Sequence, residues 1–199
     1  MPGLTAYGHS WVAGAGASDP AYRLVDVVAR RLGTTATNLG VGGSLSTDTA
    51  ALVSRQRTPA SEVYLLMTGL NDARLYGASP PGLAGYAAAL SAIVTALGRA
   101  GRGAPVLAVL QPHLLDYSLH APHHRGSDDV IDAYNERLRA VADRHPDVTL
   151  VTVHGWSPVT MLAPDRVHPD DAGHAQVADA VVRTVQAVRG SAVGGHRQD

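Results

Sequence analysis

Two reactive side chains, those of cysteine and lysine, are missing from this sequence of 199 residues. Without cysteine, a disulfide framework, a thiolate zinc site and a cysteine nucleophile are all excluded. All 16 basic residues are arginine, so a lysine Schiff base, a Ser-Lys dyad and the lysine of a phosphate-binding loop are excluded as well. The arginine bias and the abundance of Ala, Gly and Val suggest a bacterial source with a GC-rich genome.

The chain also carries little net charge. Its formal charge is -1 at pH 7 and its pI is about 6.8, so no overall field attracts nucleic acids or anionic membranes. The arginines form no basic stripe, and we therefore expect no nucleic-acid partner. The sequence has no run of about 18 apolar residues, and we expect no insertion into a membrane.

The sequence begins Met1-Pro2-Gly3 and passes directly into an apolar strand. This start lacks the basic residues, the apolar stretch and the cleavage site of a signal peptide. We therefore expect a cytoplasmic protein, although a secreted chain trimmed of its leader would look the same.

Length and composition favour one domain with a core of its own. Hydrophobic residues make up 45% of the chain and charged residues 17%, which is typical of a globular domain. We assign residues 1–189 to this domain. The segment 190–199 is rich in Gly and polar residues, and we predict a flexible tail there. The oligomeric state is not determined by the sequence.

Short apolar runs alternate with segments of helical period through the whole chain. This alternation predicts a parallel sheet of about five strands with helices on both faces, an α/β/α sandwich of three layers. Ligands of such sheets bind beyond the carboxyl ends of the strands. The predicted strands are 4–7, 36–39, 63–67, 106–110 and 148–153, and the predicted helices are 21–32, 48–56, 82–99, 130–144 and 172–188.

Four polar segments lie directly after predicted strands or before the last predicted helix. They are centred on Ser10, on Gly42-Gly43, on Asn71-Asp72 and on His168. Alone, each has an ordinary explanation as a helix cap or a turn. Together they supply the parts of an acyl-transfer site.

The chemistry expected of these parts is that of a serine nucleophile. Ser10 needs a base to take its proton, and His168 can serve because imidazole is largely neutral at pH 7. Asp165 lies three residues before His168, close enough to hold the other ring nitrogen. The negative oxygen of the tetrahedral intermediate needs donors, which the backbone N–H groups of Ser10 and Gly43 and the side-chain amide of Asn71 can provide.

In these residues the sequence resembles the SGNH superfamily, also called GDSL-like lipases and esterases, over roughly residues 2–188. The four letters of the family match Ser10, Gly43, Asn71 and His168. The resemblance implies a flavodoxin-like sandwich. Three family blocks also match, at 38–43 (Asn-x-Gly-x-x-Gly), 69–72 (Gly-x-Asn-Asp) and 165–169 (Asp-x-x-His-Pro).

One position departs from the family pattern. The usual first block is Gly-Asp-Ser, whereas this chain has Gly8-His9-Ser10. The resemblance implies that the aspartate has mainly a structural, hydrogen-bonding role, so the triad survives its replacement. We expect His9 to replace one hydrogen bond by another. A protonated His9 would instead disturb the pH response of the site.

Further candidates for substrate contact surround these blocks. Trp11 could form the floor of an acyl pocket or belong to the core, and Arg74 could meet a polar or anionic substrate group or be an ordinary surface arginine. The segment 111–127 is long for a connection and could be a pocket wall or lid, with His113 and Tyr117 facing the substrate or the surface. Its histidines match no metal-ligand spacing, so we expect no metal.

We therefore expect a serine esterase that acts on small-molecule esters with a short acyl or O-acetyl group through an acyl-Ser10 intermediate. No cofactor is implied. Two alternatives stay open: an acyltransferase that uses the same residues, and a catalytically silent ligand-binding module that keeps the fold.

Overall fold

A parallel sheet of five strands forms the centre of the molecule in the computed structural model, which describes residues 3–56 and 58–194. The strands lie in the order β2-β1-β3-β4-β5. The order reverses between β1 and β3, which places a crevice for ligands beyond the ends of these two strands. The strands are β1 (Leu4–Gly8), β2 (Ala36–Gly40), β3 (Val63–Met67), β4 (Val106–Val109) and β5 (Val148–Val151).

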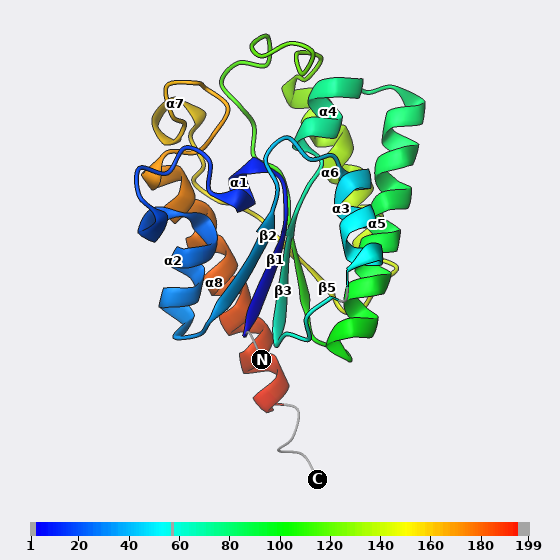
Figure 1. The fold of residues 1–199 in the computed structure, drawn as a ribbon, viewed down its shortest axis with the longest axis vertical. Helices are drawn as coiled ribbons and strands as arrows, with labels where there is room; N and C mark the ends of the chain where they lie inside the picture. The colour runs from blue at the N-terminus through cyan, green and yellow to red at the C-terminus, as the bar shows by residue number, and fades with distance from the viewer. Residues whose placement is uncertain (1–2, 57, 195–199) are drawn as a thin grey trace.

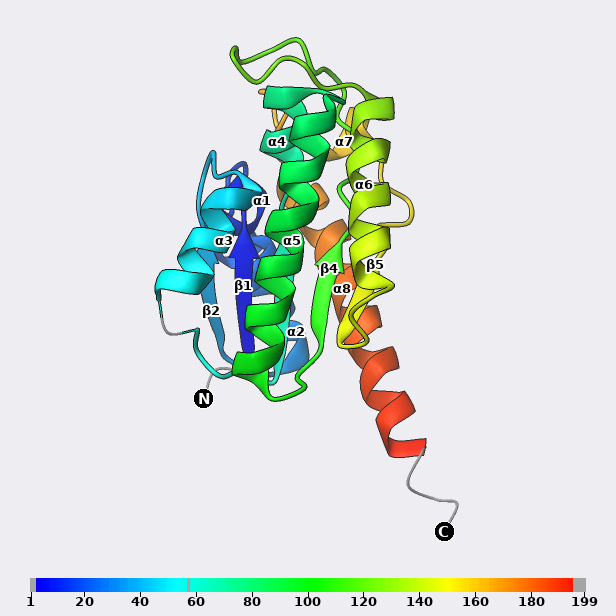
Figure 2. The ribbon, with the colours of Figure 1, turned by 90° about the vertical axis from the view of Figure 1, so that its right-hand side faces the viewer.

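Helices cover both faces of the sheet, which confirms the prediction of three layers. Figure 1 and Figure 2 show α2 and α8 on one face and α3, α5 and α6 on the other. Three short helices, α1, α4 and α7, lie at the carboxyl edge of the sheet. The helices are α1 (Ser10–Ala13), η1 (Pro20–Tyr22, a 3-10 helix), α2 (Leu24–Leu32), α3 (Ser46–Arg55), α4 (Leu70–Tyr76), α5 (Pro80–Gly101), α6 (Asp128–Ala142), α7 (Pro158–Met161) and α8 (Asp171–Gly194).

The structure differs from the sequence-based prediction mainly in these short helices. None of α1, α4 and α7 was predicted, because four to seven residues are too few for a helical period to emerge from the sequence. The last helix is also longer than predicted: α8 continues to Gly194, into the segment expected to be a flexible tail. Residues 195–199 of that segment lie outside the described residues.

Helix α5 is long and apolar enough to cross a membrane if only length and composition are considered, with a mean hydropathy of 1.4. In the structure it packs on one face of the sheet (Figure 2). Its buried side chains include Tyr86, Leu90, Ile93 and Leu97. These side chains belong to the main hydrophobic core, so α5 forms part of one layer of the sandwich.

Close contact between β1 and β3 determines how the chain leaves the sheet before Ser10. Gly8 has a φ of +150°, and a Cβ on it would overlap the carbonyl oxygen of Met67. The next residue donates from His9 N to that same oxygen at 3.2 Å. Only glycine allows the two strands to lie this close at the point where the nucleophile loop begins.

The substitution Gly8→Ala is therefore expected to lower the free energy of unfolding by roughly 2 kcal/mol or more, because both the backbone angle and the contact with Met67 oppose a side chain. Urea denaturation measures this change. Gly85→Ala is the matched control, since a Cβ at this position of α5 meets no other atom within 4 Å and helix propensity favours alanine by up to about 1 kcal/mol. Equal effects of the two substitutions would contradict the packing argument.

Candidate active site

The segments that the sequence singled out meet at the carboxyl edge of the sheet. Ser10 follows β1 directly and is the first residue of α1. Asn71 is the second residue of α4, which follows β3. His168 lies in the loop that precedes α8. The fold thus brings together residues that are up to 158 positions apart.

Ser10, His168 and Asp165 form a continuous chain of hydrogen bonds. Ser10 Oγ lies 2.9 Å from His168 Nε2, and His168 Nδ1 lies 2.6 Å from Asp165 Oδ2. The carboxylate can only accept, so Nδ1 carries the hydrogen and Nε2 is free to accept the proton of the serine hydroxyl. His168 and Asp165 keep 27% and 38% of their side chains exposed, which leaves the base within reach of a substrate.

The carboxylate of Asp165 is held by the loop it belongs to. Its Oδ1 accepts from the backbone N–H groups of Val167 at 3.0 Å and His168 at 2.9 Å. Partial burial raises the pKa of Asp165, but the hydrogen bonds from His168 and Val167 outweigh burial and hold that pKa below its usual range. Asp165 therefore stays ionised at neutral pH and can stabilise an imidazolium.

The segment after β2 contacts the end of β1, next to the nucleophile loop, and the side chain of Asn71. Val41 N donates to Gly8 O at 2.8 Å, and Asn71 Nδ2 donates to Ser44 O at 3.0 Å. Gly43 lies between these contacts with a φ of +75°, and a Cβ on it would meet no other protein atom within 4 Å. Glycine is thus favoured here by the backbone angle, and the space where a side chain would lie is open.

The position of Asn71 also depends on the next residue, Asp72. The Asp72 carboxylate is buried and accepts from Ser46 N at 2.9 Å and from Ser46 Oγ at 2.5 Å. Burial raises the pKa of Asp72, although the bonds from Ser46 oppose the shift. This pair ties the first turn of α3 to α4. Ser46 was not predicted to be part of the site; it lies three residues beyond the Gly-Gly pair, at the first position of α3.

His9 has a definite structural role at the position where the family has aspartate. Its side chain is fully buried, and its Nδ1 accepts from Trp11 N at 3.3 Å, which caps α1. Its Nε2 lies 3.0 Å from Gln111 Oε1. Burial, opposed by the hydrogen bond to Gln111 and aided by the nearby His168 and Arg74, lowers the pKa of His9 to about 4. His9 is therefore neutral at pH 7. As predicted, it forms a hydrogen bond of its own at the position of the family's aspartate.

Trp11 belongs to the core rather than to the substrate surface. It has no exposed area, so the expectation of a substrate contact is corrected in favour of the core alternative. Its Nε1 donates to Val167 O at 2.9 Å, one residue before His168. Its ring stacks on Trp156 with the centroids 5.2 Å apart. Trp11 thus connects the nucleophile helix to the loop of the base.

The other three candidate contacts have partners within the protein. Arg74 is buried, not a surface arginine, and donates from Nη2 to Leu119 O at 3.1 Å. His113 Nε2 lies 2.9 Å from Asp132 Oδ1, and Tyr117 donates to Asp128 Oδ1 at 2.8 Å. His113 and Tyr117 therefore bind the first turns of α6, and these bonds do not lead to the triad. A contact between any of these three side chains and a substrate stays a prediction.

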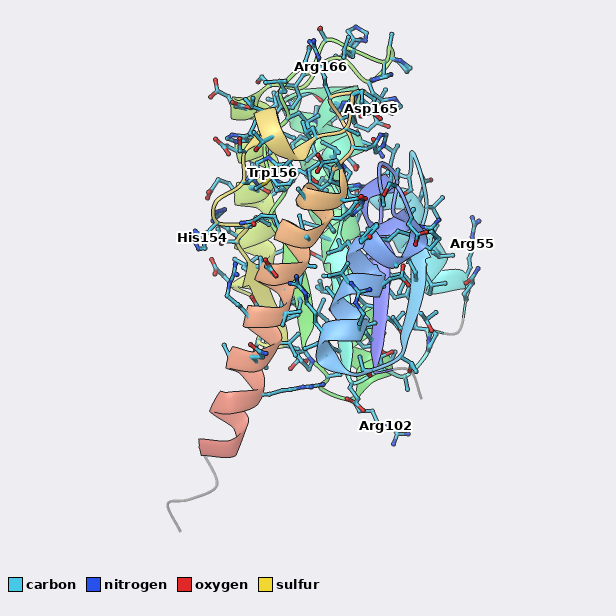
Figure 3. All side chains as sticks on the ribbon, turned by 90° about the vertical axis from the view of Figure 1, so that its left-hand side faces the viewer. Arg55, Arg102, His154, Trp156, Asp165 and Arg166 are labelled. Atoms are coloured by element: carbon cyan, nitrogen blue, oxygen red, sulfur yellow. The ribbon has the colours of Figure 1, made fainter. Side chains whose placement is uncertain are left out.

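The segment 111–127 is attached to the loop of the base, as Figures 1 and 3 show at the carboxyl edge of the sheet. His120 Nε2 lies 3.3 Å from Asp165 O, and Arg166 forms an ion pair with Asp116 at 3.6 Å. His120 and Arg166 have φ values of +65° and +61°, which non-glycine residues rarely adopt. The two segments therefore hold each other in place beside the triad.

Among residues 3–56 and 58–194, no group of three or more His, Asp or Glu side chains is arranged to hold a metal ion. The arrangement of Ser10, His168 and Asp165 can by itself perform nucleophilic catalysis of acyl transfer.

A family model described as "GDSL-like Lipase/Acylhydrolase family" matches residues 6–176. The chain belongs to this family. This GDSL-type chain is accordingly a serine esterase. No curated protein matches its sequence significantly.

Several solved structures share the fold of this chain. A lipase/acylhydrolase from Enterococcus faecalis superimposes with a TM-score of 0.72 at 18% identity, over 94% of this chain and 96% of that one. TesA gives 0.67 at 20% identity, over 92% and 98%. The salicylyl-acyltransferase SsfX3 from a tetracycline biosynthetic pathway gives 0.71 at 19% identity, over 94% of this chain and 55% of its own. At these identities the likeness shows the fold alone.

The buried neutral His9 should make the stability of the GDSL hydrolase depend on pH. The unfolded chain binds a proton at this residue near pH 6.5 and the folded chain near pH 4, so the free energy of unfolding should fall by up to about 3 kcal/mol as the pH drops from 7 to 4. Urea denaturation at both pH values, compared between the wild type and His9→Asn, isolates this contribution. The variant should show the smaller decrease, and equal decreases would contradict the assignment of a neutral His9.

Proposed function

We propose that this GDSL hydrolase cleaves small-molecule carboxylic esters with a short acyl group through an acyl-Ser10 intermediate. The observation that carries this proposal is the chain of hydrogen bonds from Ser10 Oγ through His168 to Asp165, at 2.9 Å and 2.6 Å. It has the order and direction needed for a base to take the serine proton.

In the first half of the reaction, Ser10 Oγ attacks the ester carbonyl carbon while its proton passes to His168 Nε2. The carbonyl oxygen becomes negative and is stabilised by donors that lie ready for it. We assign these donors to the backbone N–H groups of Ser10 and Gly43 and to the side chain of Asn71. One amide hydrogen of Asn71 binds Ser44 O, which leaves the second hydrogen for the substrate oxygen.

Collapse of the tetrahedral intermediate breaks the bond to the alcohol, which takes the proton from His168. Water then enters, loses a proton to His168 and attacks the acyl-serine, which releases the acid and restores Ser10. Asp165 stays ionised throughout, because hydrogen bonds from its own loop keep its pKa low.

Packing around the nucleophile supports a short acyl group. The residue after Ser10 is the fully buried Trp11, and its ring and that of Trp156 fill neighbouring space. This volume is therefore occupied by side chains instead of being open to a long chain. The open space beside Gly43 leaves room for a small group on the ester.

Acyl transfer to an alcohol or amine is the second candidate. The structural likeness to an acyltransferase, SsfX3, favours considering it. The same acyl-Ser10 would form, and an acceptor would replace water. Product analysis with an added alcohol separates the two: a new ester in place of the free acid would indicate the transferase. A silent binding module is disfavoured by the complete chain of hydrogen bonds at Ser10.

Hydrolysis of p-nitrophenyl acetate, butyrate and octanoate tests the proposal. The wild type should turn over all three with kcat/KM decreasing as the chain lengthens, and Ser10→Ala should fall to background because the nucleophile is gone. Ser91→Ala on α5 is the matched control and should keep full activity. A preference for octanoate would overturn the short acyl group, and activity retained by Ser10→Ala would overturn the nucleophile.

The role of Asn71 predicts a separate effect on rate. Asn71→Ala removes a donor that acts on the transition state, so kcat on p-nitrophenyl acetate should fall about 100-fold or more while KM changes little. Thermal denaturation of the same variant monitors the lost bond to Ser44. A lower melting temperature with unchanged kcat would assign Asn71 a purely structural role.

A further inference from the structure

Buried amide side chains connect helix α6 to the nucleophile loop. Asn135, on the buried face of α6, holds the backbone of Gln111 from both sides: Asn135 Oδ1 accepts from Gln111 N at 2.9 Å, and Asn135 Nδ2 donates to Gln111 O at 3.0 Å. The side chain of Gln111 then reaches His9 at 3.0 Å. The series ends at Trp11 N, which donates to His9 Nδ1.

Each side-chain atom between Gln111 and Trp11 is restricted to one role, either donor or acceptor. Gln111 Nε2 donates to Pro112 O at 3.2 Å, which turns Oε1 toward His9. Because Oε1 can only accept, His9 Nε2 must carry the ring hydrogen. His9 Nδ1 must then be bare, as it has to be in order to accept from Trp11 N. Gln111 thus selects the one state of His9 that can cap α1.

The cap matters because α1 is very short. A helix of four residues has little stability of its own, so its orientation depends on the groups that hold its ends. Ser10 is its first residue. Trp11, its second residue, holds Val167 O and with it the loop of His168. The state of the cap therefore affects both partners of the Ser10–His168 hydrogen bond.

We propose that Gln111 is a positioning residue for the nucleophile: by selecting the Nε2–H form of His9 it fixes α1 and so the alignment of Ser10 with His168. Asn135 fixes Gln111 in turn. The proposal rests on the proposed function, because the aligned pair is the one that forms the acyl-enzyme. It also explains how this chain functions with histidine at the position of the family's aspartate, since a neutral, correctly oriented imidazole supplies the acceptor that caps α1.

A double-mutant cycle tests whether Gln111 acts through His9. In the wild-type background, Gln111→Met removes the acceptor and keeps the volume, so kcat on p-nitrophenyl acetate should fall about tenfold with KM unchanged. In the His9→Asn background the side-chain oxygen of the asparagine caps α1, and an amide has no tautomer to select. His9→Asn should therefore keep most of the activity. There, Gln111→Met should have almost no further effect.

The control is Gln176→Met on α8. The Gln176 side chain donates to His154 O, away from α1, and its substitution should leave kcat unchanged. A merely structural role of Gln111 would lower kcat by the same factor in both backgrounds, which would overturn the proposal.

A direct measurement complements the cycle and does not depend on turnover. Nitrogen-15 chemical shifts of the histidine side chains should show His9 with a protonated Nε2 and a bare Nδ1 at pH 7, and Gln111→Met should weaken this preference. A His9 protonated at Nδ1 in the wild type would overturn the proposal.

The two proposals can fail separately. If the wild type hydrolyses no ester, the proposed function falls, and the rate at which a fluorophosphonate probe labels Ser10 replaces kcat in the cycle. Should Ser10 remain unlabelled as well, the nitrogen-15 shifts decide for or against selection of the His9 tautomer by Gln111.

Discussion

The contact between β1 and β3 at Gly8 is the constraint on which the site depends. The chain must pass the Met67 carbonyl without a side chain and then donate to that same oxygen from His9 N. Only then does α1 begin directly at the strand end, with Ser10 at the point where the strand order reverses. In parallel sheets this edge is where the other loops also arrive, so the position of one glycine determines where nucleophile, base and amide can meet.

Around this point, each reactive group is held by a residue that takes no part in the chemistry. Trp11 holds the loop of His168 through Val167, Ser46 holds α4 below Asn71 through Asp72, and the loop's own amides hold Asp165. These supports are buried or half-buried, so water competes little for their hydrogen bonds. The alignment of the triad is therefore a property of the edge of the sheet as a whole.

Much of this arrangement was predictable from the sequence, and the remainder depended on contacts between distant residues. The sheet and its covering helices followed from the alternation of apolar runs. The positions of Ser10 and Asn71 followed from their place after strands, and that of His168 from its place before the last helix. The burial of Trp11 did not, because a single aromatic residue in a helix of four residues belongs to no apolar period. Gln111 also follows a strand end, and Asn135 is a polar residue on an apolar helix face; both were signals that the sequence analysis passed over.

Helix α8 connects the catalytic edge of the molecule to its opposite end. It begins three residues after His168, at the catalytic edge, and runs the length of the sheet to Gly194 at the opposite end (Figure 1). Arg189, near that far end, pairs with Glu62, the residue directly before β3. An enzyme anchored to a solid support through the far end of α8 would present its catalytic edge to the solution, so immobilisation from this side should leave the approach of substrates unobstructed.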